Sequence, residues 1–178
     1  TCDLDKLSED CCQPGAACNN KGRVYSSFRL LHHKDGFFLS MQPGLLSTTQ
    51  QTLNKYIPFY KAQMKDVSQQ YKRIGLAGTE AEAVLKNIVQ TLPEKNHSLN
   101  VQGALIINLS EHLPRYELWL DPQNSGAFNL IFDDIPGREI AAWELLDHQA
   151  GVLLIHAQES GLYTPEELNM DLAGFISF

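Results

Sequence analysis

The chain has 178 residues, of which 43% are hydrophobic and 20% charged, and its formal net charge at pH 7 is −7. This is the balance of an ordinary globular protein, long enough for one domain or two small ones without stabilising disulfides or metals. The acidic charge argues against a broad nucleic-acid-binding surface, and the apolar runs at 104–107 and 152–155 are too short to span a membrane.

The first 17 residues are polar and show no periodicity, which predicts a loop with a turn at 13–15. All four cysteines lie within residues 1–18, and their spacing matches neither a metal motif nor a secreted disulfide framework. We therefore expect free thiols in a reducing cytoplasm, with a labile metal or cluster site as the alternative. The cysteines are Cys2, Cys11, Cys12 and Cys18.

Residues 24–41 read as a β-hairpin, because two apolar arms flank an Asp-Gly turn at 35–36. Lys21 and Arg23 stand at its mouth on either side of a glycine. These cations indicate either a solvated strand entrance or an edge that contacts an anion.

The middle of the chain alternates helical and strand patterns. An apolar stripe predicts a helix over 45–57, ended by Pro58, and weak alternation predicts a strand over 62–67. A clearer strand follows at 71–77. Thr79, with Glu82 three residues later, predicts a capped helix that ends before Pro93. Gly75 and Gly78 at this strand-to-helix turn lack the remaining residues of a phosphate-binding loop.

The second half begins with a polar loop at 94–102 and continues with strands at 104–109 and 116–120. Residues 124–132 are expected to be helical or mixed. A helix is predicted over 138–149 with Ile140, Trp143, Leu146 and Ala150 facing inward, and a strand over 152–155. This order predicts an α+β protein with antiparallel or mixed sheets and an internal boundary near 69–70.

Three segments carry a family likeness. They are residues 18–23 (Cys-Asn-Asn-Lys-Gly-Arg), residues 143–151 (Trp-Glu-Leu-Leu-Asp-His-Gln-Ala-Gly), and residues 163–170 (Tyr-Thr-Pro-Glu-Glu-Leu-Asn-Met) with Gly-Phe-Ile-Ser-Phe at 174–178. In this order and spacing the chain resembles the YgfZ-type folate-binding proteins, relatives of the glycine-cleavage T-protein, an aminomethyltransferase.

The resemblance implies an aminomethyltransferase folate-binding-domain-like fold with interleaved sheets and packed helices. Residues 1–71 plus 155–178 would form the first, discontinuous folate-binding subdomain, and residues 72–154 a second, ferredoxin-like α+β subdomain. Family members continue directly after the third segment with Lys-Gly-Cys-x-x-Gly-Gln-Glu. We therefore expect the chain to be an internal fragment of a longer protein.

The resemblance also implies a function. A tetrahydrofolate, or a derivative of it, would be the bound cofactor, and the protein would be a cytoplasmic accessory factor in iron–sulfur cluster assembly or repair. Its expected partners are a reduced folate and client iron–sulfur enzymes. Any effect on tRNA modification would be indirect, with no direct contact to nucleic acid or membrane.

Gln149 takes the position at which the family carries a glutamate that binds the pterin edge. A carboxylate accepts both pterin donors at once, whereas a glutamine offers one acceptor and one donor group. We expect folate binding weakened by about 1–3 kcal/mol, the size of one mismatched buried hydrogen bond. The alternative is that Gln149 only caps its helix.

The remaining expected folate contacts divide by chemistry. Lys21, Arg23 and Arg29 suit the glutamate tail of a folate, because carboxylates bind to Arg and Lys. Trp143, Tyr163 and Phe28 suit stacking on its rings, although the residue type alone favours a core position for each of them. Asn169 matches a family position and fits either a ligand contact or a turn.

A folate-dependent aminomethyl or one-carbon transferase is the alternative function. The T-protein carries paired aspartates on the first hairpin strand, and Tyr25 and Ser26 stand at the matching positions here. A hydroxyl near its usual pKa does not replace an ionised aspartate. The sequence therefore assigns no catalytic residue and no metal ligand, and favours an accessory protein over an enzyme.

Overall fold

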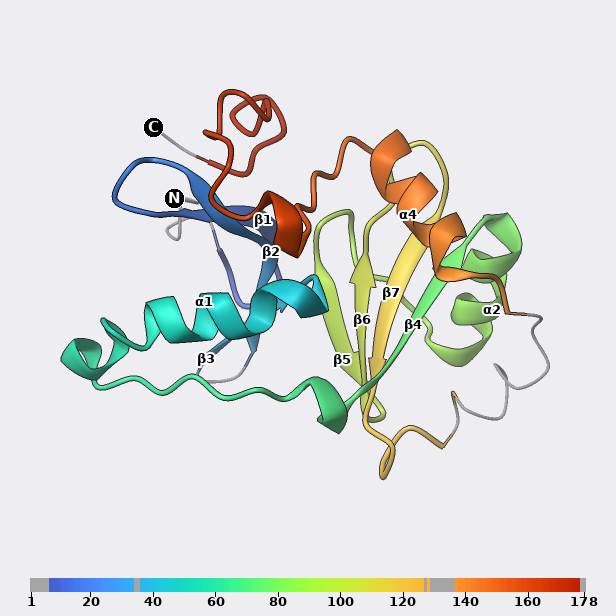
Figure 1. The fold of residues 1–178 in the computed structure, drawn as a ribbon. Helices are drawn as coiled ribbons and strands as arrows, with labels where there is room; N and C mark the ends of the chain where they lie inside the picture. Colours follow the sequence, from blue (N-terminus) through green and yellow to red (C-terminus); the bar gives the residue numbers. More distant parts are fainter. Residues whose placement is uncertain (1–6, 34–35, 127, 129–136, 177–178) are drawn as a thin grey trace. The chain divides into compact units, whose positions relative to one another are not determined.

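The computed structural model describes residues 7–33, 36–126, 128 and 137–176, and the chain divides into two compact units. One unit comprises Thr1–Lys65 with Gly151–Phe178, and the other comprises Asp66–Ala150. Each unit has its own sheet (Figure 1). The assignment of 1–71 plus 155–178 as a folate-binding subdomain and of 72–154 as a ferredoxin-like subdomain stays a prediction.

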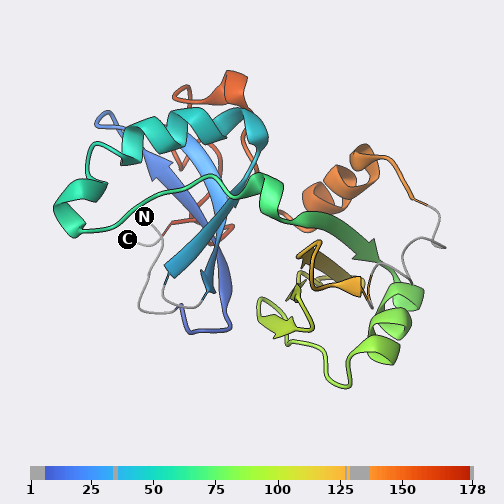
Figure 2. The same ribbon diagram turned by 90° about the horizontal axis from the view of Figure 1, so that it is seen from below.

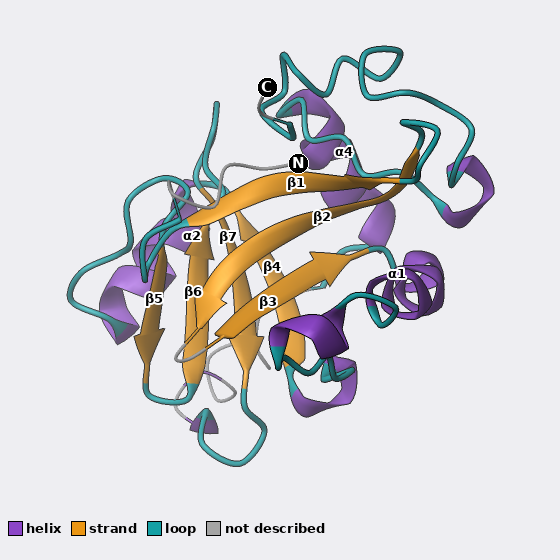
Figure 3. Cartoon of the chain, turned by 90° about the vertical axis from the view of Figure 1, so that its left-hand side faces the viewer, coloured by secondary structure: helices purple, strands orange, loops and turns teal. Residues whose placement is uncertain are grey.

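The first unit contains an antiparallel three-stranded sheet in the order β1-β2-β3 (Figure 3). The strands are β1 (Cys12–Cys18), β2 (Val24–His33) and β3 (Gly36–Met41). The predicted hairpin is confirmed as the β2–β3 pair, in which His33 faces Gly36. Its turn residues 34–35 lie outside the described residues.

β1 corrects the expectation of a loop over residues 1–17. Residues 12–18 pair with β2 along their whole length, and the predicted turn at 13–15 is instead extended strand. β1 is an edge strand, so Pro14 breaks no central ladder there, and Gly15 lies opposite Phe28. Turn-forming residue types therefore misled the prediction in this segment.

The helical segment of the first unit is shorter than predicted. α1 (Leu46–Leu53) follows a 3-10 helix at Pro43–Leu45, and a second 3-10 helix occupies Ile57–Tyr60. The expected inward stripe holds only at its start, since Leu45 and Thr49 are buried whereas Tyr56 is 60% exposed. The strand predicted over 62–67 is absent, because these residues are mostly exposed and pair with no neighbour in the described sheets.

The C-terminal part of the first unit consists of turns and one 3-10 helix, Ala157–Glu159. The strand predicted over 152–155 is wrong. Instead, Ile155 N donates to Ser27 Oγ at 2.9 Å, which docks this segment on β2 through a side chain. One hydrophobic cluster of the unit contains six buried residues: Ala16, Val24, Leu45, Ile155, Met170 and Phe175.

The second unit contains an antiparallel four-stranded sheet in the order β4-β7-β6-β5 (Figure 1). Its strands are β4 (Lys72–Ala77), β5 (Ser98–Val101), β6 (Ala104–Asn108) and β7 (Arg115–Leu120). A 3-10 helix, Ser68–Gln70, precedes β4.

β5 corrects the polar loop expected over 94–102. Gln102 and Gly103 both have positive φ, and together they form the tight turn that joins β5 to β6. Gln-Gly at this place resembles the Asn-Gly and Asp-Gly pairs of two-residue hairpins, a signal that the polarity of the segment concealed.

Two helices pack on opposite faces of this sheet (Figure 2). α2 (Thr79–Ile88) covers the face of Leu76, and α4 (Ile140–Gln149) contacts the opposite face at Gly75. Gly78 rather than Thr79 is the N-cap of α2, and no side-chain bond caps it, so the predicted capping box is wrong. The core beneath α2 consists of Leu76, Leu85, Val89, Ala104, Ile106, Tyr116, Leu118, Leu120 and Phe128.

α4 confirms the predicted helix and most of its predicted face. Trp143, Leu146 and Ala150 are half-buried, and they contact the sheet or line the pocket at Arg115, as expected. Ile140 is the exception at 78% exposure, and Asp147, which was not expected inside, is the only buried residue of the helix. Within the described ranges no helix has the length and apolar character needed to cross a membrane. Residues 127 and 129–132 of the expected segment 124–132 lie outside the described residues.

Candidate functional site

Arg115, the first residue of β7, is 2% exposed and anchors the site. Its backbone is fixed on both sides, because Arg115 N donates to Ser110 Oγ at 2.9 Å and Arg115 O accepts from Leu109 N at 2.8 Å. Ala77 of β4 lies opposite it in the ladder. The short connection 110–114 and the β4–β7 pairing therefore fix the direction of this arginine.

Two residues of α4 contact the Arg115 side chain. Its Nη2 donates to Asp147 Oδ1 in a buried ion pair. Its guanidinium carbon lies 4.5 Å from the centroid of the Trp143 ring, which is cation–π distance. On α4 these residues are four positions apart and so lie on one face of the helix.

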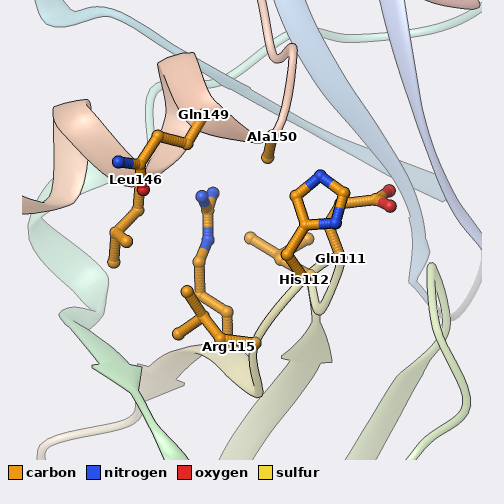
Figure 4. A pocket seen from close by; sticks show the side chains of 8 residues that line it. Glu111, His112, Arg115, Leu146, Gln149 and Ala150 are labelled. Atoms are coloured by element: carbon orange, nitrogen blue, oxygen red, sulfur yellow. The ribbon is translucent and has the colours of Figure 1, made fainter.

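A small pocket lies where the β6–β7 connection meets the end of α4 (Figure 4). Its volume is about 30 Å³. The guanidinium of Arg115 lies in the middle of it, between Gln149 of α4, the following Ala150, and His112 of the connection. The lining residues are Leu109, Glu111, His112, Leu113, Arg115, Leu146, Gln149 and Ala150.

The structure brings two of the expected folate contacts, Trp143 and Gln149, to this place. Trp143 is half-buried against Gly75 and Arg115, and Gln149, the last residue of α4, is exposed. The helix end is closed by backbone groups, because Ala150 N donates to Leu146 O at 3.0 Å and Gly151 has a φ of +69°. Gln149 is thus presented at the surface, at the end of the helix that carries Trp143.

The fit of a pterin to these residues is partial. The pocket volume of about 30 Å³ suffices for about two water molecules and is too small for a bicyclic ring. A pterin at this end of α4 would contact the exposed Gln149 amide and the exposed part of Trp143. The contacts of Trp143 with Gly75 and Arg115 occupy the rest of the indole.

The other six expected residues belong to the first unit. Lys21 and Arg23 lie in a tight loop, in which both backbone N–H groups donate to Asn19 Oδ1, at 2.9 and 3.1 Å. Lys21 is exposed, whereas Arg23 Nη1 donates to the carbonyl of Leu162. Val24 N donates to Tyr163 O at 2.9 Å, so the loop and the Tyr163 segment lie side by side.

Three of the expected folate contacts lie in ordinary structural environments: Phe28, Arg29 and Asn169. Phe28 on β2 is 8% exposed, a core position, and Arg29 beside it is half-buried. Asn169 is exposed with a φ of +52°, a turn conformation that asparagine tolerates well. Contact of these residues with a ligand stays a prediction.

The family-like segment 163–170 is built around reciprocal hydrogen bonds. Thr164 N donates to Glu167 Oε2 at 2.7 Å, and Glu167 N donates to Thr164 Oγ1 at 3.3 Å. The bond from the Thr164 backbone, helped by the Thr164 hydroxyl and by the charge of Arg23, lowers the pKa of Glu167 below its ordinary value. Met170 N closes the turn on Pro165 O at 2.9 Å. Much of this motif therefore serves local structure.

Tyr25 and Ser26, at the positions of the T-protein aspartates, are buried on β2, at 7% and 0% exposure. Burial raises the pKa of the Tyr25 hydroxyl, which moves it further from an ionised base. Burial also raises the pKa of Cys18, a free thiol, and the carboxylate of Glu166 adds to this effect. Cys11 is half-buried, Cys12 is buried, and Cys2 lies outside the described residues.

Three residues of the site were not predicted: Arg115, Asp147 and Gly75. Arg115 is the first residue of β7 and lies on the face opposite Tyr116, Leu118 and Leu120. This alternation was the sequence pattern that could have placed Arg115 on the second face of the sheet. Asp147 offered no such signal, because a carboxylate on a helix is usually exposed.

No protein-family model matches the chain. Curated relatives match over its full length, and they include the tRNA-modifying protein YgfZ of Escherichia coli O7:K1 (strain IAI39 / ExPEC) and that of Shigella dysenteriae serotype 1 (strain Sd197). Each is 29% identical over 182 residues, covering 100% of this chain and 55% of the relative. The chain thus spans about half the length of these relatives. The matches confirm the resemblance to YgfZ-type proteins that the three sequence segments predicted.

Proposed function

We propose that this chain is the folate-binding part of an accessory protein that supports tRNA modification through iron–sulfur enzymes. Support for the tRNA link is the match over the whole chain to relatives named as tRNA-modifying proteins.

The observation that carries the folate part is the arrangement of Trp143 and Gln149. Both residues belong to α4 and both border Arg115, Trp143 through its ring and Gln149 through the pocket lining, and the Gln149 side chain is exposed. In this proposal the Gln149 carbonyl accepts one hydrogen bond from the amino-pyrimidinone edge of a pterin. The Gln149 amide group faces the second pterin donor, so one bond is left unmade and binding is weaker than with a glutamate.

The first unit, taken by itself, also contains candidate folate contacts. Lys21 is exposed, whereas Arg23 donates to the Leu162 carbonyl. Tyr163 is 42% exposed, and its backbone carbonyl accepts a hydrogen bond from Val24, next to this loop. We propose Lys21 as a contact for a ligand carboxylate, Tyr163 as a contact for an aromatic ring, and Arg23 as a positioning residue.

A titration with 5-formyltetrahydrofolate tests the folate proposal. The chain has two tryptophans, so Trp119→Phe leaves Trp143 as the single fluorophore. We expect a saturable change in Trp143 fluorescence. Gln149→Glu should tighten binding about tenfold, since one charge-assisted hydrogen bond is gained.

The matched controls are Gln149→Leu, which removes both polar groups, and Gln90→Leu, which makes the same change at an exposed position after α2. Binding should weaken in the first and stay unchanged in the second. Absence of saturable binding in the unmodified chain would overturn the folate proposal. Binding that is equal in all the Gln149 variants would remove Gln149 from the site.

The proposed effect on tRNA is indirect, because the chain carries a net charge of −7. Electrophoretic mobility measurements with bulk tRNA at 150 mM salt should show no saturable complex. A specific complex under these conditions would replace the indirect proposal by direct recognition. The one-carbon transferase gains no support from the buried hydroxyls of Tyr25 and Ser26, and it remains a hypothesis from the sequence.

A further inference from the structure

The pocket around Arg115 contains hydrogen-bond donors that the protein does not use. Arg115 Nε and Nη1 are buried and have no acceptor among the described residues, while Nη2 is paired with Asp147. The side chain is only 3% exposed. A buried cationic donor without an acceptor is costly, so native structures satisfy such groups with protein, water or ligand.

The surroundings of Arg115 restrict what can serve as the acceptor. Leu109, Leu113 and Leu146 give the pocket an apolar wall. Three polar side chains complete the lining: Glu111, His112 and Gln149. Of these, Glu111 is in an ion pair with Lys95 at 2.6 Å. In the described structure none of these three side chains accepts a hydrogen bond from Arg115 Nε or Nη1.

We propose that Arg115 binds the carboxylate group of a small molecule in this pocket. A carboxylate has two oxygens with four lone pairs, which suits a guanidinium that still has N–H groups on both Nε and Nη1. The volume of about 30 Å³ admits a carboxylate group and excludes a ring. Asp147 holds the guanidinium from the side of α4, and Trp143 fixes its plane by cation–π contact.

Gln149 lines this pocket and is also a proposed pterin contact, but the carboxylate proposal rests on the buried donors of Arg115 and requires no pterin. Two sources of carboxylate fit the chemistry: a free small acid such as formate or acetate, and the carboxylate end of a larger ligand such as the glutamyl tail of a folate. Both predict that Arg115 Nη1 donates to a ligand oxygen. They differ in whether acetate and folate compete.

Thermal unfolding in acetate or formate, with acetamide and sodium chloride as controls at matched ionic strength, tests the proposal. We expect the Tm to rise by about 3 °C or more when the carboxylate exceeds its Kd about tenfold. The Arg Nε–H resonance of Arg115 in a ¹H–¹⁵N NMR spectrum should shift with the same saturation curve. An equal response to acetamide or chloride would overturn the proposal.

Replacing Arg115 would also break its buried ion pair with Asp147. A variant that fills the pocket tests carboxylate binding without this side effect. Ala150→Leu places a larger side chain in the pocket and leaves Arg115, Asp147 and Trp143 unchanged. Ala83→Leu makes the same change at an exposed position of α2. The acetate response should be lost in the first and kept in the second; an acetate response kept in Ala150→Leu would overturn the proposal.

A competition experiment distinguishes the two sources of the carboxylate. If acetate weakens binding of 5-formyltetrahydrofolate, the folate tail is the natural occupant, and if both bind together, a free carboxylate is. If no folate binds, the acetate response still decides the Arg115 site, so failure of the proposed function and failure of this inference are distinguishable. A crystal structure grown in acetate that shows only water at Arg115 would overturn it.

Discussion

Trp143 of α4 lies directly on Gly75 of β4, and the contact leaves no room for a side chain at residue 75. A Cβ atom at Gly75 would lie 2.6 Å from Trp143 Cζ3 and 2.9 Å from Cδ2, and closer still to Cε3. The conformation of Gly75 is ordinary extended strand, so this glycine is required by packing and not by its backbone angles. The same residue belongs to the Gly-x-x-Gly pattern that looks like a phosphate loop in the sequence.

Gly75→Ala should therefore destabilise the second unit by about 1–3 kcal/mol, the usual cost of overpacking a filled interface. Urea unfolding followed by circular dichroism measures the change. Gly36→Ala is the matched control, because Gly36 also lies in a strand and its Cβ would meet nothing within 4 Å. A Gly75→Ala chain as stable as the unmodified chain would show that Trp143 can move off the sheet.

The buried pair of Arg115 and Asp147 should be worth far more than a surface pair. Asp147→Ala leaves a buried guanidinium without its carboxylate, and we expect a loss of about 3–5 kcal/mol in the free energy of unfolding. Glu82→Ala removes an exposed pair with Lys86 on α2 and should cost about 0.5 kcal/mol. Similar losses in the two variants would mean that Arg115 finds water when Asp147 is removed.

Gly103 is required by backbone conformation as well as by space. Its φ is +78°, and a Cβ there would lie 2.6 Å from the backbone carbonyl group of Asn124. Gly103→Ala should destabilise the chain by more than about 1 kcal/mol, because alanine is strained at this φ. Gly137→Ala, at an open position with ordinary φ, should change stability little. Equal urea midpoints for the two variants would contradict this role of the β5–β6 turn.

Sequence reasoning succeeded where periodicity and turn chemistry agreed. The hairpin of β2 and β3, the strand β4 and the pair β6–β7 all have apolar residues at strand spacing and clear breakers between them. It failed for β1 and β5, whose Pro14 and polar residues are tolerated because both strands lie at sheet edges. Edge position is a tertiary fact, and local composition does not show it.

The candidate site was predictable only in part for a related reason. Gln149 and Trp143 were found by resemblance, but their structural partners Gly75 and Arg115 come from strands distant in the chain. The partnership of Arg115 with Asp147 depends on a carboxylate that shares one face of α4 with Trp143. An apolar-stripe argument finds Trp143 and Leu146 on that face, but it does not find the carboxylate, and it wrongly includes Ile140, which is exposed.

The pH dependence of the turn at 164–170 follows from the lowered pKa of Glu167. The Thr164 N–H bond and hydroxyl stabilise the ionised carboxylate in the folded chain. A carboxyl whose folded pKa lies below its unfolded value contributes stability that is fully present above the unfolded pKa. Here that value is about 4.5, and the contribution is lost as the pH falls through the folded pKa.

NMR titration of the Thr164 amide should report a midpoint below 4.5. In Glu167→Gln the loss of stability between pH 5 and pH 3 should be shallower than in the unmodified chain. Glu166→Gln removes the same charge next to it, keeps the Thr164–Glu167 bonds, and should keep the steeper slope. A Thr164 midpoint at or above 4.5 would show that these bonds do not hold the turn in solution.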